Sequence, residues 1–383
     1  MKILYTNFHP GDGGGHTTYL CSLLVGLSAS HALTVACPAK SKLNRLAREI
    51  PGVEVVDVDF PGRVSEISAI LRNVKLLRQC LKQGKFDVVH VNGSPDHRLI
   101  SWARLGGGFG EAIVLTKHNH LPVRRGMDQN WRAKHHTDAV IVVAEAVLPQ
   151  LRGTPYFHKA TVVRNGVDLT RFSPVDAAAR AAARTLYFPE AAADDLILVS
   201  VAGTAWHKGW LTLIAARAQL AAESQTKIWI ALAGKPRQTS AIAKRLGWDV
   251  AQVDSQIRFV GALSDVRPFV AAGDVGFVLS YDVETISFAC REMMAMGKPV
   301  LLSRYAGLPE NITPDVEGWL ISPQDVAACA GVLERLLREK SDLDAWGHRA
   351  RLRAEAAFGM AAFLQSTLAV YQSVTQARQP ASH

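Results

Sequence analysis

The chain has 383 residues, of which 48% are hydrophobic and 20% are charged. This composition excludes a disordered chain, and the length suits two domains of about 100–200 residues each. No run of about 18 apolar residues indicates a membrane span, and the first seven residues resemble a strand rather than a secretion signal. The five cysteines are scattered and never form a C-x-x-C pair, which favours reduced, buried thiols in the cytosol over disulfides or a zinc site.

The net charge of +9 lies entirely in the first half. Residues 1–172 hold 22 Lys and Arg against 13 Asp and Glu, and the remaining residues are balanced. Two interpretations remain open. The excess forms a solvated basic face without a partner, or it meets an anionic one, such as nucleic acid, anionic lipid or a phosphorylated substrate.

Short Val/Ile-rich runs alternate with helical stretches through the first half. The pattern predicts strands over residues 2–7, 32–37, 53–58, 88–91, 113–116, 139–143 and 160–163. It predicts helices over residues 17–28, 43–49, 66–82, 98–104, 131–135 and 147–152. Repeated strand–helix units with buried strands predict a doubly wound parallel sheet.

The pattern starts again after an Ala/Arg-rich segment over residues 174–195, which we interpret as a linker with a short helix. Strands are predicted over residues 196–201, 227–233, 257–260, 275–279 and 300–303, with helices over 210–222, 242–246, 266–271 and 287–296. We therefore expect two α/β domains, 1–174 and 175–358, facing a central cleft that binds a bridging ligand. Residues 359–383 should form an amphipathic helix that packs back on the first domain and braces both, followed by a disordered tail.

A glycine-rich segment, Gly13-Gly14-Gly15-His16, lies between the first strand and the first helix. Glycines there let backbone N–H groups approach a ligand, and a helix N-terminus favours an anion. The segment lacks the spacing of a dinucleotide fingerprint, because G-x-G-x-x from Gly11 reaches His16. A plain tight turn is the alternative. Thr116-Lys117-His118 ends another strand, where doubly wound sheets place ligands, although a single histidine is more often structural.

Two segments of the second half carry charged residues at positions where they could bind a ligand. Lys208 follows the first strand of that half and is placed to reach phosphate oxygens, although loop lysines are common. Glu284 and Glu292 are eight residues apart, so we expect Glu284 in a loop and Glu292 within the following helix. The N–H groups of residues 286–289 would then face an anion or sugar hydroxyls. The alternative for the two glutamates is a solvated helix face.

Possible metal ligands are less convincing. Asp57 and Asp59 form a D-x-D pair, but they continue a predicted strand and lie far along the chain from the other motifs. His135, His136 and Asp138 lack metal-ligand spacing on one face. We therefore expect no metal site.

The glycine segment, Thr116–His118, the Lys208 segment and the pair of glutamates occur in the same order as motifs of a known family. They resemble the motifs of the family-4 retaining glycosyltransferases of the GT-B fold, which carry an E-x7-E motif. The resemblance extends to Val163–Asp168, to Arg258-Phe259-Val260-Gly261, which is similar to the segment lining the nucleotide base, and to Ala306–Glu310. The chain departs from the family where Gly203-Thr204 replaces a usual Gly-Arg, which leaves Lys235 as a candidate substitute cation. It also departs at Arg291, where an apolar residue is usual.

The resemblance implies transfer of a sugar, with retention, from a nucleotide-diphosphate donor, with UDP favoured, and without a cofactor or an obligatory metal. It implies that Glu292 binds the ribose, that Glu284 binds hydroxyls of the sugar and that His118 positions the sugar. The catalytic candidates are His118, Glu284 and Lys208. The donor-binding candidates are Gly14, Gly15, His16, Thr204, Lys208, Lys235, Val260, Gly261, Ile286, Ser287, Phe288 and Glu292.

The resemblance also implies that the acceptor, a glycan or lipid-linked glycan of cell-surface polysaccharide or lipopolysaccharide synthesis, binds in the first domain. We expect no nucleic-acid partner and a cytoplasmic protein, peripheral on the inner membrane face. The predicted helix 66–82 would present Arg72, Lys75, Arg78 and Lys82 to anionic lipid. Its other side would be buried against the sheet, and that side contains Ile67, Ile70, Leu71, Val74, Leu77 and Leu81. The alternatives are a GT-B sugar-nucleotide epimerase and a non-catalytic sugar-nucleotide-binding protein.

Overall fold

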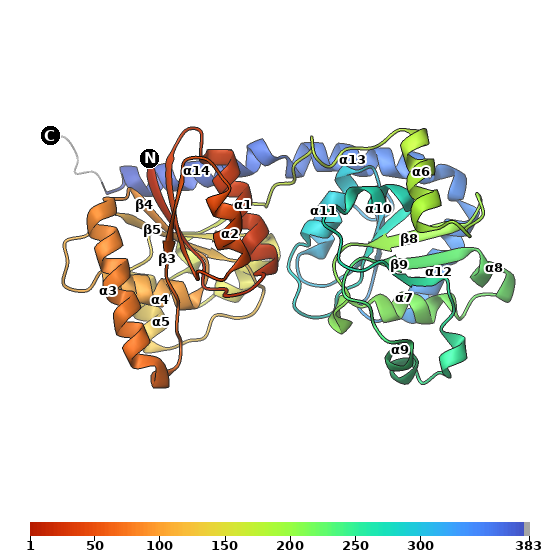
Figure 1. The fold of residues 1–383 in the computed structure, drawn as a ribbon, viewed down its shortest axis with the longest axis horizontal. Coiled ribbons are helices and arrows are strands. Elements are labelled where there is room, and N and C mark those ends of the chain that lie inside the picture. Colours follow the sequence, from red (N-terminus) through yellow and green to blue (C-terminus); the bar gives the residue numbers. More distant parts are fainter. Residues whose placement is uncertain (379–383) are drawn as a thin grey trace. The chain divides into compact units, whose positions relative to one another are not determined.

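The computed structural model describes residues 1–378, which fold as two compact units (Figure 1). Unit 1 contains Met1–Gly166 and the chain from Met360 onward, and unit 2 contains Val167–Gly359. Residues 167–174 thus belong to unit 2, whereas the sequence analysis placed the boundary after residue 174. The reason is packing, because Phe172 is buried in the unit 2 core and Val167 pairs with Gly359. Part of the predicted disordered tail, residues 379–383, lies outside the described residues.

Unit 1 is built on a seven-stranded parallel sheet with the order β3-β2-β1-β4-β5-β6-β7. Its strands are β1 (Lys2–Thr6), β2 (Ala32–Cys37), β3 (Val53–Asp57), β4 (Val88–Val91), β5 (Ala112–Lys117), β6 (Ala139–Val142) and β7 (Ala160–Val162). The strand order reverses between β1 and β4, which is the position where doubly wound sheets open a crevice at the strand carboxyl ends.

Helices cover both faces of this sheet (Figure 1). They are α1 (Gly14–Leu27), α2 (Lys42–Arg48), α3 (Ile67–Gly84), α4 (Ser94–Ala103), α5 (Met127–His135) and α14 (Met360–Gln376), with 3₁₀ turns at Val64–Glu66, Glu145–Leu151 and Phe157–Lys159. On one face, Leu77 and Leu81 of α3 and Leu99 of α4 share a core with the strands. On the other, α14 packs on α1, where the Tyr19 and Phe363 rings lie 5.4 Å apart.

Unit 2 contains a six-stranded parallel sheet with the order β10-β9-β8-β11-β12-β13. Its strands are β8 (Leu196–Ser200), β9 (Ile228–Leu232), β10 (Ile257–Phe259), β11 (Val275–Val278), β12 (Val300–Ser303) and β13 (Gly318–Ile321). Its helices are α6 (Ala177–Tyr187), α7 (Trp210–Arg217), α8 (Ala222–Thr226), α9 (Thr239–Leu246), α10 (Arg267–Ala272), α11 (Phe288–Ala295), α12 (Val326–Arg338) and α13 (Leu343–Phe358). Its 3₁₀ turns are Trp206–Lys208, Val250–Gln252, Leu308–Asn311 and Lys340–Asp342. The residues of α7 and α12 pack in one core, and those of α6, α10, α11 and α13 pack in another.

Several predicted elements differ from the observed ones for identifiable reasons. The predicted helix over 147–152 is a 3₁₀ turn, because Pro149 lies inside it and cannot donate an α-helical hydrogen bond. The expected linker is part of unit 2, because α6 anchors there through Arg180 and Arg184, which bind Asp274. The five cysteines are free, and three of them are buried. In residues 1–378, no helix has the length and apolar character needed to cross a membrane.

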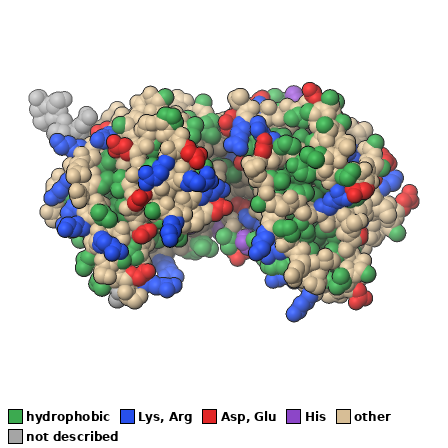
Figure 2. All heavy atoms as spheres, viewed as in Figure 1, with side chains coloured by type: hydrophobic (Ala, Val, Ile, Leu, Met, Phe, Trp, Pro, Cys, Tyr) green, Lys and Arg blue, Asp and Glu red, His purple; other side chains and the backbone are tan. Residues whose placement is uncertain are grey.

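The predicted burial of α3 is partly wrong. Leu77 and Leu81 are buried as predicted, together with Asn73. Ile67 and Leu71 are 61% and 64% exposed, because the face that packs on the core does not extend to them. The guanidinium of Arg78 donates to the carbonyls of Ala103 and Leu105 at the end of α4 (2.8 and 2.7 Å), so it is not free to meet lipid. Figure 2 shows Lys and Arg side chains scattered over this face of unit 1, interspersed with Asp and Glu, rather than gathered in one patch.

Candidate functional site

In unit 1, a polar cluster lies at the carboxyl ends of β4 and β5. His118 directly follows β5, and its Nε2 lies 3.0 Å from the Oδ1 of Asn92, which directly follows β4. The Asn92 amide nitrogen donates to the carbonyls of Thr6 and His90, so its oxygen faces the imidazole. A neutral His118 therefore carries its proton on Nε2 and donates it to Asn92.

Three histidine rings pack against one another in this cluster, one pair tilted and the other edge to face. The His16 ring centroid lies 4.0 Å from that of His118 and 4.5 Å from that of His9. Burial lowers the pKa of His16 to about 3, and burial followed by the neighbouring His16 lowers the pKa of His118 well below its usual value. His118 is thus a neutral imidazole near pH 7, so it can act on a sugar through hydrogen bonds rather than through charge.

The cluster is supported from below by a hydrogen-bonded chain. Thr116 Oγ1 lies 2.6 Å from the Nε2 of His90 and 3.1 Å from the hydroxyl of Tyr19. The Nδ1 of His90 bonds the hydroxyl of Tyr371, which comes from α14. The C-terminal helix α14 therefore fixes the positions of His90 and Thr116, on which the cluster packs.

The glycine segment forms the first turn of α1 rather than a loop before it. Gly13 and Gly14 have φ angles of 70° and 48°, and a Cβ on Gly13 would lie 2.4 Å from Thr17 Oγ1. Glycine is therefore required for this entry into the helix. The N–H groups of Gly14 and Gly15 lie in the first turn, where no carbonyl of the helix can accept them, so they are placed to bind an anion.

In unit 2, the central feature is an ion pair between Lys208 Nζ and Glu284 Oε2 at 2.9 Å. The two side chains are 19% and 11% exposed. Gly209, with φ 73°, lets the chain turn into α7 against β11, since a Cβ there would lie 1.8 Å from the carbonyl oxygen of Leu279. The Lys-Gly pair thus places the ammonium at the carboxyl edge of the sheet.

The loop that carries Glu284 has strained backbone angles and is held by hydrogen bonds from a neighbouring segment. Val283 and Ser287 have φ angles of 47° and 54°, a conformation that costs roughly 1–3 kcal/mol per residue. Asn311 holds the loop by donating from Nδ2 to the carbonyl of Ile286 (2.9 Å), and the N–H of Gly307 donates to the carbonyl of Thr285 (2.8 Å). The strain is therefore maintained by the segment around residues 307–311.

Helix α11 begins at Phe288 and is capped by Ser287, whose Oγ accepts from the N–H of Cys290 (3.3 Å). Burial raises the pKa of Glu292 to about 7, and the positive charge of Arg171 only partly offsets this. Within residues 1–378, the Glu292 carboxyl has no hydrogen-bond partner. A half-buried carboxyl of this kind suits a ligand that supplies hydroxyl donors.

Two further loops adjoin at the sheet edge. The N–H of Gly234 donates to the carbonyl of Gly261 (2.7 Å), and Thr204 Oγ1 donates to the carbonyl of Lys235 (2.7 Å). The Lys235 side chain itself is exposed. Arg237 instead turns back, donating from Nε to the carbonyl of Thr204 (2.9 Å).

Comparison with known proteins identifies the family. Residues 13–171 match the family described as Glycosyltransferase Family 4, and residues 195–339 match Glycosyl transferases group 1. A D-inositol 3-phosphate glycosyltransferase of Kribbella flavida is 30% identical over 96% of this chain and 92% of its own length. The chain belongs to the GT-B glycosyltransferases. A lipopolysaccharide core biosynthesis glycosyltransferase of Rhizobium meliloti, LpsE, is 25% identical over 89% of this chain and 90% of its own.

Solved structures agree on the fold of this glycosyltransferase. HepE of Anabaena, solved in complex with UDP and glucose, aligns over 97% of this chain and 100% of its own with a TM-score of 0.79 and 18% identity. WaaG, a glycosyltransferase involved in lipopolysaccharide biosynthesis, aligns over 96% and 99% with a TM-score of 0.67 and 16% identity.

The predicted site residues of the glycosyltransferase fall in both units. Gly14, Gly15, His16 and His118 lie in unit 1, and the others lie in unit 2. There the carbonyl of Ile286 accepts from the side-chain amide of Asn311, and the N–H of Val260 donates to the carbonyl of Leu232. The sequence analysis missed Asn92 and Arg237. Asn92 directly follows a buried strand, and this position alone could have marked it. Nothing in the sequence distinguishes Arg237 from other loop arginines.

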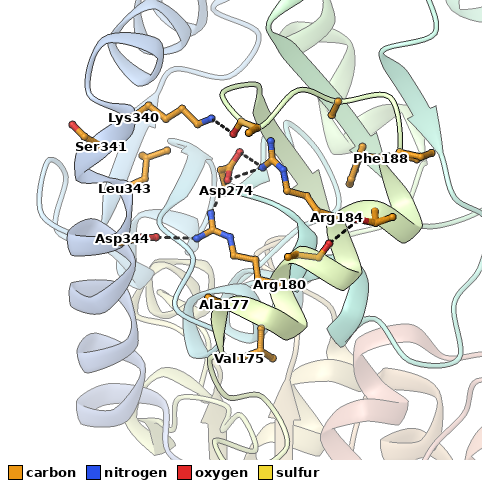
Figure 3. A pocket seen from close by; sticks show the side chains of 15 residues that line it. Val175, Ala177, Arg180, Arg184, Phe188, Asp274, Lys340, Ser341, Leu343 and Asp344 are labelled. Carbon is orange, nitrogen blue, oxygen red and sulfur yellow. Dashed lines mark hydrogen bonds and ion pairs between the residues drawn. The ribbon is translucent and has the colours of Figure 1, made fainter.

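A cavity of about 810 Å³ in unit 2 is lined by other residues, between α6 and the start of α13. Figure 3 shows Arg180 and Arg184 of α6 pointing at Asp274, which they bind at 2.7 and 3.2 Å. Arg180 also binds Asp344 (3.0 Å), so these charges satisfy one another, and we assign the cavity no ligand. No group of three or more possible metal ligands occurs in the described part of the chain, and Asp57 bonds Asn44 and Arg48 (2.8 Å each).

Proposed function

We propose that this glycosyltransferase transfers a sugar, with retention, from a UDP-sugar to a glycan or lipid-linked acceptor of cell-surface polysaccharide or lipopolysaccharide synthesis. The observation that carries the proposal is the Lys208–Glu284 ion pair, in the same unit as the Glu292 carboxyl, which has no hydrogen-bond partner among residues 1–378. This arrangement supplies a cation for a diphosphate and two carboxyls for hydroxyl groups. The HepE complex with UDP and glucose and the lipopolysaccharide role of LpsE support the donor and the pathway.

In the proposed mechanism, groups of the protein itself stabilise the negative charge that develops on the leaving diphosphate. When the donor binds, Lys208 leaves Glu284 and holds the diphosphate, whose negative charge grows as the bond to the anomeric carbon breaks. Glu284 then accepts hydrogen bonds from hydroxyls of the sugar, and Glu292 accepts those of the ribose. The N–H groups at the start of α11 add positive potential. No resident cofactor or metal takes part in the proposal.

The neutral His118 would donate or accept a hydrogen bond at the transferred sugar. The hydrogen bond of His118 to Asn92 fixes the imidazole ring, so the ring would present one defined orientation to the sugar. We further propose that the enzyme works at the inner membrane face, where a lipid-linked acceptor is found. The exposed side of α3, with Ile67 and Leu71 beside Arg72 and Lys75, supports this.

A donor screen tests the proposed function. Purified enzyme is incubated with UDP-, GDP- and ADP-sugars, with and without glycan acceptors, and nucleoside diphosphate release and the anomeric configuration of the product are measured. We expect UDP release that persists in EDTA and falls roughly 10²–10³-fold in Lys208→Ala. Lys227→Ala, which removes an exposed lysine of the same unit, is the control.

Two results would contradict the proposal. Conversion of the UDP-sugar to its epimer would indicate an epimerase instead. Binding of a UDP-sugar without turnover under any acceptor condition would indicate a non-catalytic binding protein.

A further inference from the structure

Unit 1 contains a cavity of about 520 Å³ at the carboxyl ends of β4 and β5. His16, Asn92 and His118 line one side of it, so it adjoins the histidine cluster. The first turn of α4, at Gly93 and Ser94, lines another side. A cavity of this size is adequate for a sugar residue, and its position next to His118 suits the group that receives the transferred sugar.

Apart from its histidines, the charged side chains that line this cavity are all positive. The lining includes Lys117, Arg124 and Arg132 and no aspartate or glutamate. Arg132 is neutralised, because its guanidinium binds the Asp128 carboxylate at 2.8 Å and its remaining donors reach Ser94 and His97. Lys117 and Arg124 therefore supply the positive charge of the cavity.

Neither of these two cations has an acidic partner within residues 1–378. Lys117 Nζ donates only to neutral oxygens, the Oδ1 of Asn119 (2.9 Å) and the carbonyl of Leu121 (2.6 Å). Burial lowers the pKa of Lys117 to about 8, so its ammonium is poorly solvated where it stands. A cation that has lost water without gaining an anion is stabilised by an anionic ligand.

The other walls suit a sugar ring. Phe8, Leu121, Val123 and Tyr156 present apolar and aromatic surface to the cavity, against which the C–H face of a pyranose packs. The cavity therefore combines an apolar wall with a positively charged edge formed by the segment between β5 and α5.

We propose that this cavity binds the acceptor through a phosphate or carboxylate group carried close to the hydroxyl that is glycosylated, and that Lys117 and Arg124 bind this group. Identifying the ligand of this cavity as the acceptor rests on the proposed function. The anionic preference itself rests on the cavity. The acceptor class is thus an acidic or phosphorylated sugar rather than a neutral one.

The test measures binding of small probes to the full-length protein by ligand-detected NMR. The probes are glucose 6-phosphate, glucuronate and neutral methyl glucoside. We expect both anionic probes, or the one whose group matches the natural acceptor, to bind roughly tenfold or more tightly than the neutral probe. The double variant Lys117→Gln/Arg124→Gln should lose this preference, and Lys117→Arg/Arg124→Lys should keep most of it.

The matched control is Arg72→Gln/Lys75→Gln, which removes the same charge from α3, away from the cavity. Equal binding of the neutral and anionic probes by the wild type would overturn the inference. An equal loss in the control variant would overturn it too, because the preference would then come from the overall field of the unit. If the wild type binds the anionic probes but releases no UDP from any UDP-sugar, the proposed function fails while the anion site stands.

Discussion

At the scale of single residues, the proposed contact of Glu292 with the ribose leads to a pH dependence of donor binding. It lies within α11, where burial raises its pKa to about 7, and the described residues offer it no hydrogen-bond donor. A carboxyl that is costly to ionise alone becomes easier to ionise when hydroxyls donate to it. Donor binding should therefore lower the Glu292 pKa, which couples affinity to pH.

The sign of this coupling can be worked out. Above about pH 7 the free carboxyl is already ionised, so UDP-sugar affinity should be at its full value. Below pH 7 the donor must displace a proton, so affinity should fall by up to about tenfold per pH unit until the lower pKa of the complex is reached. Calorimetry with UDP-glucose between about pH 5.5 and 8 measures this, since the sugar diphosphate has no group that titrates in this range.

Glu292→Gln is the matched variant, because it keeps the shape and an acceptor oxygen but cannot titrate. Its affinity should be weaker at pH 8 and nearly independent of pH. If wild type and variant followed the same pH profile, Glu292 would not be the group that meets the ribose.

At the scale of elements, the strands could be predicted well, whereas the helices α1, α4 and α5 begin three or four residues earlier than predicted. Runs such as Val88–Val91 are buried on both faces of the sheet, so hydrophobicity alone marks them. The start of α1 was missed because Gly14 and Gly15 have low helix propensity, although the positive φ angles of Gly13 and Gly14 explain why glycine occurs there. The C-terminal helix α14 was predicted, but the elements between residue 303 and α14, including β13 and α13, were not.

The site shows the same limit. The positions of Lys208 and Glu284 at strand ends were predictable from the order of the motifs, but their ion pair was not, because they are separated by 76 residues and meet only when β8 and β11 pair. The exposure of Leu71 could not be predicted either. The apolar arc of α3 is wider than the surface it covers, and only the packing partner decides which part is buried.

Arg291 gives the E-x7-E loop a support that the sequence marked only as a departure from the family. It is 1% exposed, donates from Nε to Asn311 Oδ1 (2.9 Å), and lies 4.1 Å from the centre of the Phe358 ring. Asn311 in turn donates to the carbonyl of Ile286. Arg291 therefore fixes Asn311, which fixes the strained loop between Glu284 and α11.

We expect Arg291→Met, which fills similar space without the donor, to lower the free energy of unfolding by about 1–3 kcal/mol, because a buried acceptor loses its partner. It should also raise the KM for the donor, since the loop relaxes. Arg338→Met, on the exposed side of α12, is the control. Chemical denaturation of Arg291→Met, Asn311→Ala and the double variant completes a thermodynamic cycle. Strictly additive effects would show that the two side chains do not act together.

At the scale of the whole molecule, the net charge of +9 is less concentrated than the sequence suggested. Basic and acidic side chains alternate over the face of unit 1 in Figure 2, and Arg78 is bound to carbonyls of its own unit. The surface of α3 that remains for a membrane combines Ile67 and Leu71 with Arg72 and Lys75. Such a mixture suits insertion of two apolar side chains between headgroups, with the cations beside anionic lipid.

The corresponding prediction concerns vesicle sedimentation. The enzyme should bind vesicles containing anionic lipid, bind neutral vesicles far less, and dissociate at high salt, because exposed charges are screened. Each cation near an anionic surface contributes about 1 kcal/mol, so Arg72→Gln/Lys75→Gln should weaken partitioning by about 2 kcal/mol, or roughly 30-fold. Arg304→Gln/Arg338→Gln removes the same charge from exposed positions of unit 2 and should have little effect. Equal sedimentation with neutral and anionic vesicles would exclude electrostatic docking by α3. No sedimentation with either would favour an enzyme that takes its acceptor from solution, because nothing would then hold it at the membrane.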